Sequence, residues 1–316
     1  MPLYNEAASL QEVHDALVVS LHEAVDDDYE IVYCDDGSTD ETPQLLKKLH
    51  QANSRVKVIR LSRNFGKENA LSAGLQQASG QAIMMIDGDG QHPVELIPRF
   101  VEAWKAGAQV VIGIRTDSEG LKLLKKLRSR VFYGLFNKLS TQKLIPGSTD
   151  FRLIDRAVQQ AFLELKESDR VTRGLIDWLG FRRQFVYFKA KPRQHGTPTY
   201  SRRKLLILAV NSLVSLSRTP LYIFGYLGMF ITTVAFLLGT SVFVEQLLLN
   251  DPWHWHFTGT AMLGILTVFL VGIVLLSQGI LSLYISLIHN QSKQRPLFVI
   301  DYQASAGISK AAHGQD

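Results

Sequence analysis

The chain has 316 residues, of which 46% are hydrophobic and 20% charged, and its formal net charge is +5. This composition excludes a disordered tail and leaves room for one large domain with a smaller appendage, or for two modest domains. Lys and Arg dominate residues 122–218, ahead of apolar sequence. That order indicates a surface facing anionic lipid. Nucleic acid is not an expected partner, because no nucleic-acid-binding motif accompanies the charge.

Short apolar runs alternate with longer amphipathic ones before residue 202. They predict strands at residues 30–34, 56–61, 82–86 and 110–114, and helices at residues 9–24, 42–52, 67–78 and 94–106. This alternation predicts an α/β domain with a mostly parallel sheet covered on both faces, which binds ligands at the carboxyl ends of its strands. The single cysteine, Cys34, is expected to be a small buried hydrophobe within a strand.

Two acidic motifs follow predicted strands. Residues 35–40 (Asp-Asp-Gly-Ser-Thr-Asp) are equally compatible with a capped βα loop and with carboxylates that bind a base or ribose. Residues 87–93 (Asp-Gly-Asp-Gly-Gln-His-Pro) place two carboxylates in a tight turn, where they can converge on Mg²⁺ or Mn²⁺. A structural turn is the alternative, but two adjacent carboxylates repel each other unless a cation is present, which favours a metal site.

Two uncharged stretches, residues 219–244 and 257–288, are each longer than the roughly 20 residues that cross a bilayer. Lys and Arg flank the pair on the outside, and the connecting residues 250–256 carry neither. The positive-inside rule therefore predicts a multi-pass protein of the inner or plasma membrane with a cytoplasmic catalytic domain. Residues 205–217 predict a membrane-surface helix, and residues 122–133 either another such helix or a solvated basic one.

The order of these motifs resembles glycosyltransferase family 2, and within it the polyprenyl-phosphate glycosyltransferases related to dolichol-phosphate mannose synthase. The resemblance runs from residue 2 to about residue 290. Its motifs are Pro2-x-Tyr4-Asn5-Glu6, residues 35–40, residues 63–67 (Arg-Asn-Phe-Gly-Lys), residues 87–93, Gly113-x-Arg115, residues 150–153 (Asp-Phe-Arg-Leu), Arg173-Gly174 and Arg193-x-x-Gly196. It implies a GT-A, Rossmann-like fold and inverting, metal-dependent transfer of a hexose from a nucleotide sugar to undecaprenyl phosphate. UDP-glucose is the expected donor, with UDP-N-acetylglucosamine and GDP-mannose as alternatives.

The resemblance also implies roles for individual residues. The nucleotide sugar would contact Pro2, Tyr4, Glu6, Asp36, Lys67, Asp87 and Arg193. The metal ion would bind Asp87, Asp89 and Gln91, and the acceptor phosphate would face Arg115, Lys125 and Ser129. Asp89, Asp150 and Arg115 would serve catalysis, with Asp150 as a weak base or an orienting group. For Lys67, an ordinary surface lysine that opens a helix is the alternative.

These observations predict a GT-A domain at residues 1–200, an interfacial helix at 201–218, a two-span domain at 219–290 and a cytoplasmic tail at 291–316. Gly225, Gly228 and Gly239 permit close helix packing and so a homo-oligomer. The family has a central strand immediately before its Pro-x-Tyr-Asn-Glu motif, whereas this sequence has Met1 there. A start-site truncation is the expected reason, and it would leave backbone groups of both neighbouring strands without partners.

Three other functions compete with this one. A processive polysaccharide synthase would need more spans and a Gln-x-x-Arg-Trp element, which the sequence lacks. A non-catalytic membrane protein that binds a nucleotide sugar would keep the same pocket. A two-span transporter is least favoured, because Glu245 and His289 lie at the ends of the apolar stretches and leave no central ion path.

Overall fold

The computed structural model describes residues 1–116, 145, 147–167, 170–189, 230–231, 233–234, 237 and 259–308. The chain forms two compact units: Met1–Leu135 with Gln142–Ser201 and Arg295–Asp316, and Phe136–Thr141 with Arg202–Gln294. The predicted membrane-surface helices and the loop at residues 250–256 lie outside the described residues, as does most of the first predicted span. Their structure and the four domain boundaries therefore stay predictions.

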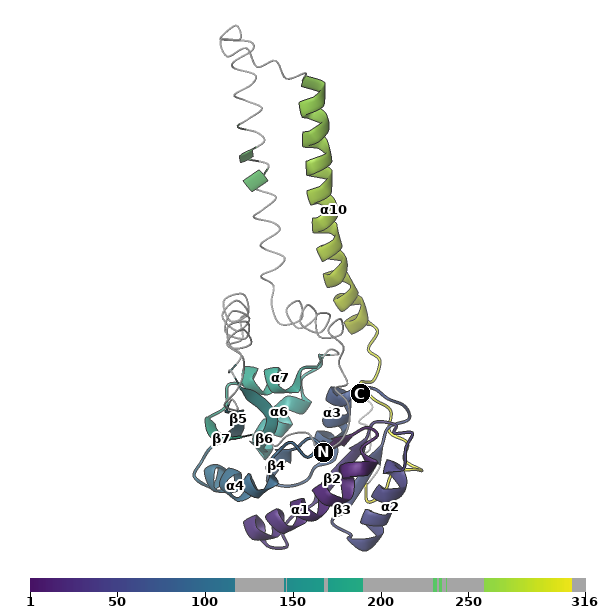
Figure 1. The fold of residues 1–316 in the computed structure, drawn as a ribbon, viewed down its shortest axis with the longest axis vertical. Coiled ribbons are helices and arrows are strands. Elements are labelled where there is room, and N and C mark those ends of the chain that lie inside the picture. The colour runs from purple at the N-terminus through teal and green to yellow at the C-terminus, as the bar shows by residue number, and fades with distance from the viewer. Residues whose placement is uncertain are drawn as a thin grey trace. The chain divides into compact units, whose positions relative to one another are not determined.

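The first sheet is parallel and has the order β1 (Pro2–Leu3), β2 (Ile31–Asp35), β3 (Val56–Arg60) (Figure 1). Its strands are connected by α1 (Ala7–Val25) and α2 (Thr42–Ala52), and α3 (Lys67–Gln77) follows β3. In the register of β2 and β3, Asp35 lies opposite Arg60. Because all three strands run the same way, the loops that follow β1 and β2 meet at one edge of the sheet.

The second sheet has the order β4 (Ala82–Met85), β6 (Ser148–Asp155), β5 (Val110–Arg115), β7 (Arg183–Phe188). Strand β6 is antiparallel to both β4 and β5, whereas β7 is parallel to β5. The helical elements here are η1 (Val94–Leu96), α4 (Ile97–Lys105), α6 (Arg156–Leu163) and α7 (Thr172–Trp178). The four predicted strands and four predicted helices are confirmed to within a few residues. The sheet is mixed because β6, which the sequence did not reveal, inserts between two predicted strands.

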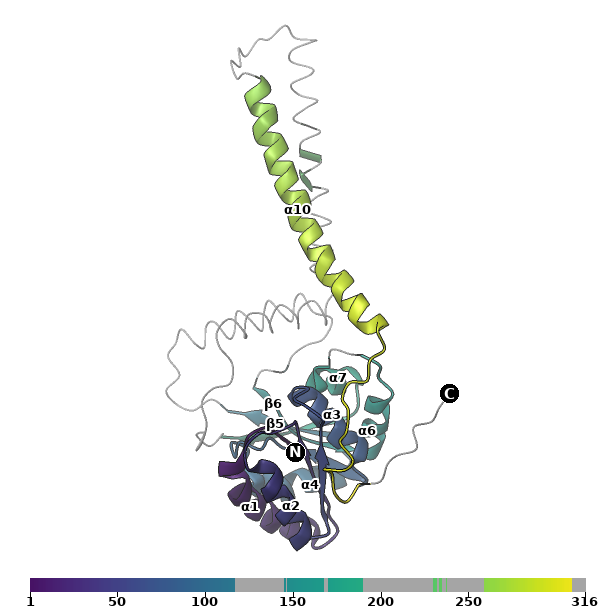
Figure 2. The same ribbon diagram turned by 90° about the vertical axis from the view of Figure 1, so that its right-hand side faces the viewer.

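Helices cover both faces of the sheets, as the strand–helix alternation predicts. Helices α1, α2 and α4 lie on one face, and α3, α6 and α7 on the other (Figure 2). The two-residue period of a strand explains this division: Ile31 and Tyr33 of β2 pack towards α1, whereas Cys34 packs against Ala70 and Ala73 of α3. Cys34 is completely buried, which confirms that it is a core residue.

A cavity of about 630 Å³ lies beside the short strand β1. Its walls come from β2, β4, α1, α3 and α4, and Met1 borders it. The amino group of Met1 donates a hydrogen bond of 2.8 Å to the carbonyl oxygen of Val32. Among the described strands, β4 pairs on one side only, with β6. Strand β1, which has two residues, lies at the edge of its sheet and pairs with β2.

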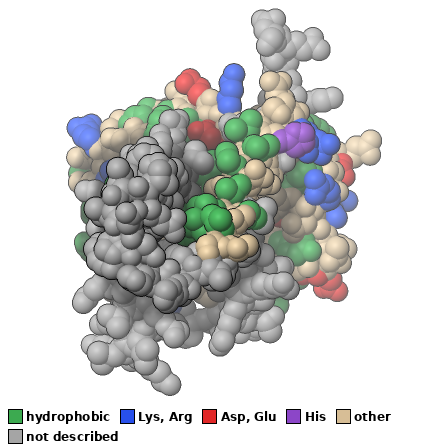
Figure 3. All heavy atoms as spheres, turned by 90° about the horizontal axis from the view of Figure 1, so that it is seen from above, with side chains coloured by type: hydrophobic (Ala, Val, Ile, Leu, Met, Phe, Trp, Pro, Cys, Tyr) green, Lys and Arg blue, Asp and Glu red, His purple; other side chains and the backbone are tan. Residues whose placement is uncertain are grey.

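Helix α10 (Gly259–Ser292) has 34 residues and contains an uncharged window, Phe269–Ser286, with a mean hydropathy of 2.0. None of the residues of that window whose burial is described is buried. Hydrophobic side chains gather over α10 in the space-filling view (Figure 3), and the large exposed ones include Leu263, Leu266, Phe269, Val271, Val274, Leu281, Ile285 and Ile288. Within the described residues, α10 is the one helix long and apolar enough to cross a membrane. It coincides with the second predicted span.

Candidate active site

The Asp87–Asp89 turn follows β4 and is fixed by contacts on several sides. Ser9 of α1 donates a hydrogen bond of 3.2 Å to the carbonyl oxygen of Gly88. A Cβ atom at Gly88 would lie 2.3 Å from Cδ2 of Leu3, so a larger residue here would have to displace that side chain. The Nδ1 atom of His92 accepts a hydrogen bond of 3.2 Å from the backbone N–H of Asp87. The turn is therefore held against β1 and α1.

His92 supports this turn from a hydrophobic environment. Its ring stacks on Phe151 of β6 with centroids 5.0 Å apart, and its edge faces Phe188 of β7 at 6.2 Å. Burial lowers the pKa of His92, and nearby carboxylates only partly offset this effect. A neutral imidazole can accept the hydrogen bond from Asp87, whereas an imidazolium cannot. His92 thus positions the acidic turn, a role that the sequence did not predict.

Lys67 lies between two of the predicted site carboxylates. Its Nζ atom is 2.7 Å from Oδ1 of Asp87 and 2.7 Å from Oδ2 of Asp150. Burial alone would lower the pKa of Lys67, but the two carboxylates outweigh it and hold that pKa above its usual value. Burial likewise opposes ionisation of Asp150, but Lys67, then Arg173 and Arg152, keep the pKa of Asp150 below its usual value. Lys67 thus forms ion pairs with two carboxylates of the predicted site, while its contact with a nucleotide sugar stays a prediction.

Asp36 connects β2 to the loop that carries Lys67. Its Oδ1 atom accepts a hydrogen bond of 2.7 Å from the N–H of Phe65, and its Oδ2 atom accepts one of 2.9 Å from Gly66. Burial raises the pKa of Asp36, and these backbone donors partly offset that rise. Gly37 adopts φ +72°, and a Cβ atom there would lie 2.6 Å from the backbone of Arg63. Asp36 and Gly37 thus set the start of α3, while contact of Asp36 with a nucleoside stays a prediction.

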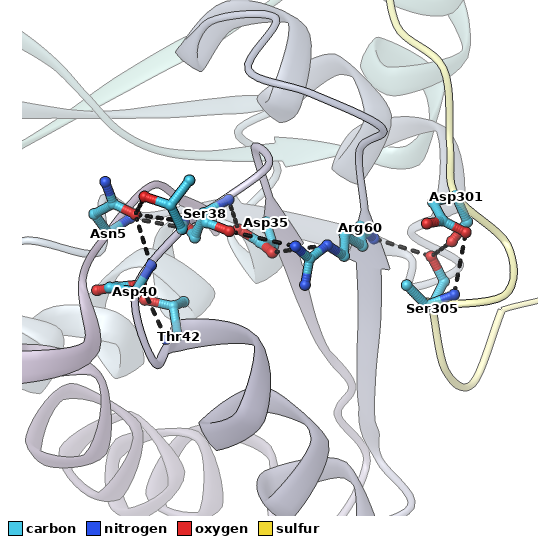
Figure 4. Close-up of polar contacts among 10 residues, drawn as sticks. Asn5, Asp35, Ser38, Asp40, Thr42, Arg60, Asp301 and Ser305 are labelled. Atoms are coloured by element: carbon cyan, nitrogen blue, oxygen red, sulfur yellow. Dashed lines mark hydrogen bonds and ion pairs between the residues drawn. The ribbon is translucent and has the colours of Figure 1, made fainter.

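The loop after β1 is joined to the loop after β2 through Asn5 (Figure 4). The Oδ1 atom of Asn5 accepts a hydrogen bond of 2.9 Å from the N–H of Thr39, and the N–H of Asn5 donates one of 2.9 Å to Oγ of Ser38. Asn5 adopts φ 56°, a conformation that asparagine tolerates better than most residues. Tyr4 beside it is 44% exposed, so its ring is available to a ligand.

The described side chains fit a divalent cation only in part. No group of three or more His, Cys, Asp or Glu side chains in the described part of the chain could hold a metal ion. Asp87 and Asp89 stand two residues apart, and Oδ1 of Asp89 accepts a hydrogen bond of 3.1 Å from the N–H of Gln91. Mg²⁺ is commonly held by one or two carboxylates together with substrate phosphates. The two aspartates suit that arrangement, with the remaining ligands supplied by a diphosphate and water.

The structure does not bring every predicted site residue together. Arg115 ends β5 with its side chain exposed, and its backbone N–H donates to Gly147 at 2.8 Å. Pro2 lies in β1, and Oε2 of Glu6 accepts a hydrogen bond of 3.3 Å from Oγ of Ser9. Lys125, Ser129 and Arg193 lie outside the described residues. The acceptor side of the site therefore stays a prediction.

Arg60 and Arg152 are two buried or half-buried cations whose roles the sequence did not reveal. Arg152 is completely buried in β6 and forms an ion pair of 2.8 Å with Asp177 of α7. Arg60 ends β3, and its Nε atom lies 3.8 Å from Oδ2 of Asp35. The position of Arg60 in the sequence could have revealed its role. It is the last residue of a predicted strand, and in a parallel sheet that residue lies beside the acidic loop of the neighbouring strand.

Comparisons with known proteins agree with this architecture. The sequence matches the family described as glycosyl transferase family 2 over residues 1–162. It is 34% identical over 300 residues to the uncharacterized glycosyltransferase sll0501 of Synechocystis, covering 95% of this chain and 93% of the relative. It is also 34% identical over 300 residues to the bactoprenol glucosyl transferase of Shigella phage SfV, covering 95% and 96%. Among solved structures, glucosyl-3-phosphoglycerate synthase from Mycobacterium tuberculosis is similar with 20% identity and a TM-score of 0.43, covering 68% of this chain and 78% of that one.

The acidic loops after β2 and β4, together with the family model and the relatives, identify an α/β glycosyltransferase with a fold of the GT-A type. The chain belongs to glycosyl transferase family 2. The family predicted from the sequence motifs is therefore confirmed.

Proposed function

We propose that this protein transfers glucose from UDP-glucose to polyprenyl phosphate and so forms polyprenyl-phosphate-linked glucose. The observation that carries this proposal is Lys67, held between Asp87 and Asp150 where β4 and β6 meet the loop before α3. Such a cluster provides both a cation for a diphosphate and carboxylates for a metal ion and a sugar. The named activity of the phage relative, bactoprenol glucosyl transfer, favours glucose and a polyprenyl acceptor.

On the donor side, Asp87 and Asp89 would hold Mg²⁺ or Mn²⁺. When bound, the metal ion would neutralise part of the charge that develops on the departing diphosphate. Lys67 contributes a second positive charge close to those carboxylates. The β1 loop, with Tyr4 exposed, and the loop after β2 offer the nucleoside a surface at the carboxyl edge of the first sheet.

On the acceptor side, an oxygen of polyprenyl phosphate attacks C1 of glucose while the bond from C1 to the UDP oxygen breaks, with inversion at C1. Both electrons of the breaking bond leave with UDP. A phosphate monoester is ionised at neutral pH, so the reaction needs little help from a general base. Asp150 then serves to orient the sugar or Lys67, and Arg115, Lys125 and Ser129 would hold the acceptor phosphate. Most of the rate enhancement comes from positioning and electrostatic stabilisation.

The test uses the full chain, purified in detergent, with undecaprenyl phosphate and a panel of labelled UDP-glucose, UDP-N-acetylglucosamine and GDP-mannose. A lipid-linked sugar should form from UDP-glucose and not from the other two donors. EDTA should abolish its formation until Mg²⁺ or Mn²⁺ is added back. Asp89→Asn should lower the rate about 10²-fold or more at unchanged thermal stability, because one charge that serves the transition state is lost.

Three results would each contradict a different part of the proposal. Full activity of Asp89→Asn in EDTA would overturn the metal assignment. Tight binding of UDP-glucose without formation of any lipid product would instead favour a non-catalytic nucleotide-sugar-binding protein. A product from a different donor in the panel would correct the identity of the sugar and leave the reaction class standing.

A membrane location accompanies this function, because a polyprenyl chain stays in the bilayer. Helix α10 supplies one apolar helix of sufficient length. Two spans, a cytoplasmic catalytic domain and a possible homo-oligomer belong to the same proposal.

A further inference from the structure

Residues 298–308, which follow α10 in the chain, run along the outer edge of β3. The backbone of Val58 exchanges two hydrogen bonds with Ala306, of 2.9 and 2.8 Å, and the N–H of Ser62 donates one of 2.9 Å to Val299. Isolated antiparallel bridges join Leu61 to Ile300 and Val58 to Ala306. This segment therefore satisfies an edge that would otherwise expose unpaired backbone groups.

Between those bridges, the segment holds both backbone groups of Arg60. The N–H of Arg60 donates to Oγ of Ser305 at 2.9 Å, and the N–H of Asp301 donates to the carbonyl oxygen of Arg60 at 2.8 Å. The Ser305 hydroxyl in turn donates to the carbonyl oxygen of Asp301 at 2.7 Å. The Oδ1 atom of Asp301 accepts hydrogen bonds from the backbone of Gln303 and Ala304, at 3.1 and 3.2 Å. Ser305 thus belongs to a closed turn that fixes Arg60 (Figure 4).

The side chain of Arg60 points to the loop after β2. Its Nη2 atom donates to the carbonyl oxygen of Ser38 at 3.3 Å. Its Nε atom faces Oδ2 of Asp35, a buried carboxylate oxygen that no hydrogen bond satisfies. The other oxygen, Oδ1, accepts from the N–H of Ser38 at 2.8 Å. Among the described residues, Arg60 therefore places its positive charge beside Asp35, and it holds the loop through Asp35 and the carbonyl oxygen of Ser38.

Hydrophobic contacts provide a second connection. Phe298, Ile300 and Ile308 pack against a buried cluster that includes Ala70 and Ala73 of α3. Helix α3 begins at Lys67, so the same segment supports the helix whose first residue reaches Asp87 and Asp150. The segment thus contacts β3, which carries Arg60, and the cluster beneath α3, which carries Lys67.

We propose that residues 298–308 are a positioning element for the nucleotide, in which Ser305 and Asp301 hold Arg60 and Arg60 holds the loop of residues 35–40. This inference rests on the proposed function, because it assigns the nucleotide to that loop. The residues after the membrane helix are then part of the transferase domain in function as well as in packing. Ser305, Asp301 and Arg60 act through the loop and need not touch the substrate.

The test compares Ser305→Ala, Ser305→Thr and Gln303→Ala in the full chain. Gln303 is an exposed neighbour whose described hydrogen bond comes from its backbone, so Gln303→Ala is the matched control. Ser305→Ala should raise KM for UDP-glucose about three- to tenfold, the factor that corresponds to one hydrogen bond. The turnover number and KM for undecaprenyl phosphate should stay within a factor of two. Ser305→Thr retains the hydroxyl and should restore the donor KM.

Hydrogen exchange gives a readout that needs no substrate. The amides of residues 35–42 should exchange faster in Ser305→Ala than in the wild type and in Gln303→Ala. Unchanged donor KM and unchanged exchange in Ser305→Ala, with an active wild type, would overturn the inference. A lower melting temperature with no change in either readout would mean that the segment only stabilises the fold, and would also overturn it. An inactive wild type would instead refute the proposed function, and the exchange rates alone would then decide whether residue 305 controls the loop.

Discussion

Lys67 connects three parts of the chain through one ammonium group. It begins α3, and its partners Asp87 and Asp150 come from the turn after β4 and from β6. Without a cation between them, these carboxylates would repel each other in a largely buried place. The ammonium thus stabilises the pair of carboxylates, and under the proposed function it would also supply a positive charge to the diphosphate.

Replacement of Lys67 tests this role. Lys67→Met should lower kcat/KM for UDP-glucose about 10²- to 10³-fold, because a charge that stabilises the leaving diphosphate is lost. Lys57→Met is the matched control, since Lys57 pairs with Glu30 at the start of β3. Initial rates at saturating Mg²⁺ and melting temperatures would be measured for both variants. Equal activity of Lys67→Met and Lys57→Met would show that Lys67 only fills the space between the carboxylates.

Arg152 shows a different use of a buried charge. It is 0% exposed and donates hydrogen bonds to Asp177, to Oγ of Ser148 and to the carbonyl oxygen of Thr149. These contacts tie the first residues of β6, which include Asp150, to α7. The sequence revealed the motif at residues 150–153 but not the structural role of its arginine. The partner of Arg152, Asp177, lies 25 residues away along the chain.

Removal of the partner carboxylate should be costly. Asp177→Ala leaves the Arg152 guanidinium buried without its counter-ion, and we expect a loss of about 3–5 kcal/mol of unfolding free energy. Chemical denaturation of the purified protein in detergent would measure it. Asp177→Asn, which keeps a hydrogen-bond acceptor, should lose less than Asp177→Ala. Equal stability of Asp177→Ala and the wild type would mean that water replaces the carboxylate.

At the scale of elements, the sequence predicted those strands and helices whose hydrophobic pattern can be recognised in the local sequence alone. Strands β2, β3 and β5 are rich in Val and Ile, β4 is a run of Ala, Ile and Met, and the helices between them show helical periodicity. Strand β6 was missed because Arg152 interrupts its apolar run, and its burial depends on a partner from α7. Strand β7 was missed because most of its side chains are exposed. The formation of β6 and β7 therefore depends on tertiary contacts, which the local sequence pattern does not contain.

The cavity beside β1 leads us to predict that a longer β1 would pair with β2 and fill it. Four residues such as Val-Ile-Val-Val, added before Met1, would continue β1 parallel to β2 and fill space lined by β2 and β4. Burial of such side chains should raise the melting temperature by about 5 °C or more. A Gly-Ser-Gly-Ser extension of equal length is the control and should change it little. Equal melting temperatures for the two extended chains would mean that the cavity does not accept a strand.

The same extension should change the dependence of stability on pH. Burial lowers the pKa of the Met1 amino group from 8.0 to about 6. The unfolded chain therefore binds more protons than the folded chain between these two values, so stability should rise as pH increases from 6 to 8. The Val-Ile-Val-Val chain replaces this buried, titrating amino group with an amide and should lose that rise. Melting temperatures at pH 6 and pH 8 would show the difference.

At the scale of the whole molecule, charge and hydropathy predicted more about the membrane than the described structure tests. Helix α10 confirms that one apolar stretch is a helix of sufficient length. The positive-inside rule makes a further statement, about the side of the membrane on which each loop lies. That statement concerns the protein in a bilayer, and labelling in cells can test it.

The single cysteine makes such labelling simple. Cys34 is completely buried, and burial raises the pKa of its thiol, so a membrane-impermeant maleimide should not label the wild type. Asn250→Cys, in the predicted outer loop, should be labelled in intact spheroplasts. Gln303→Cys, at an exposed position of the C-terminal segment, should be labelled only after the membrane is opened. Labelling of residue 303 in intact spheroplasts would contradict a cytoplasmic C-terminal segment. Because that segment pairs with β3, it would also place the transferase domain on the wrong side for a cytoplasmic nucleotide sugar.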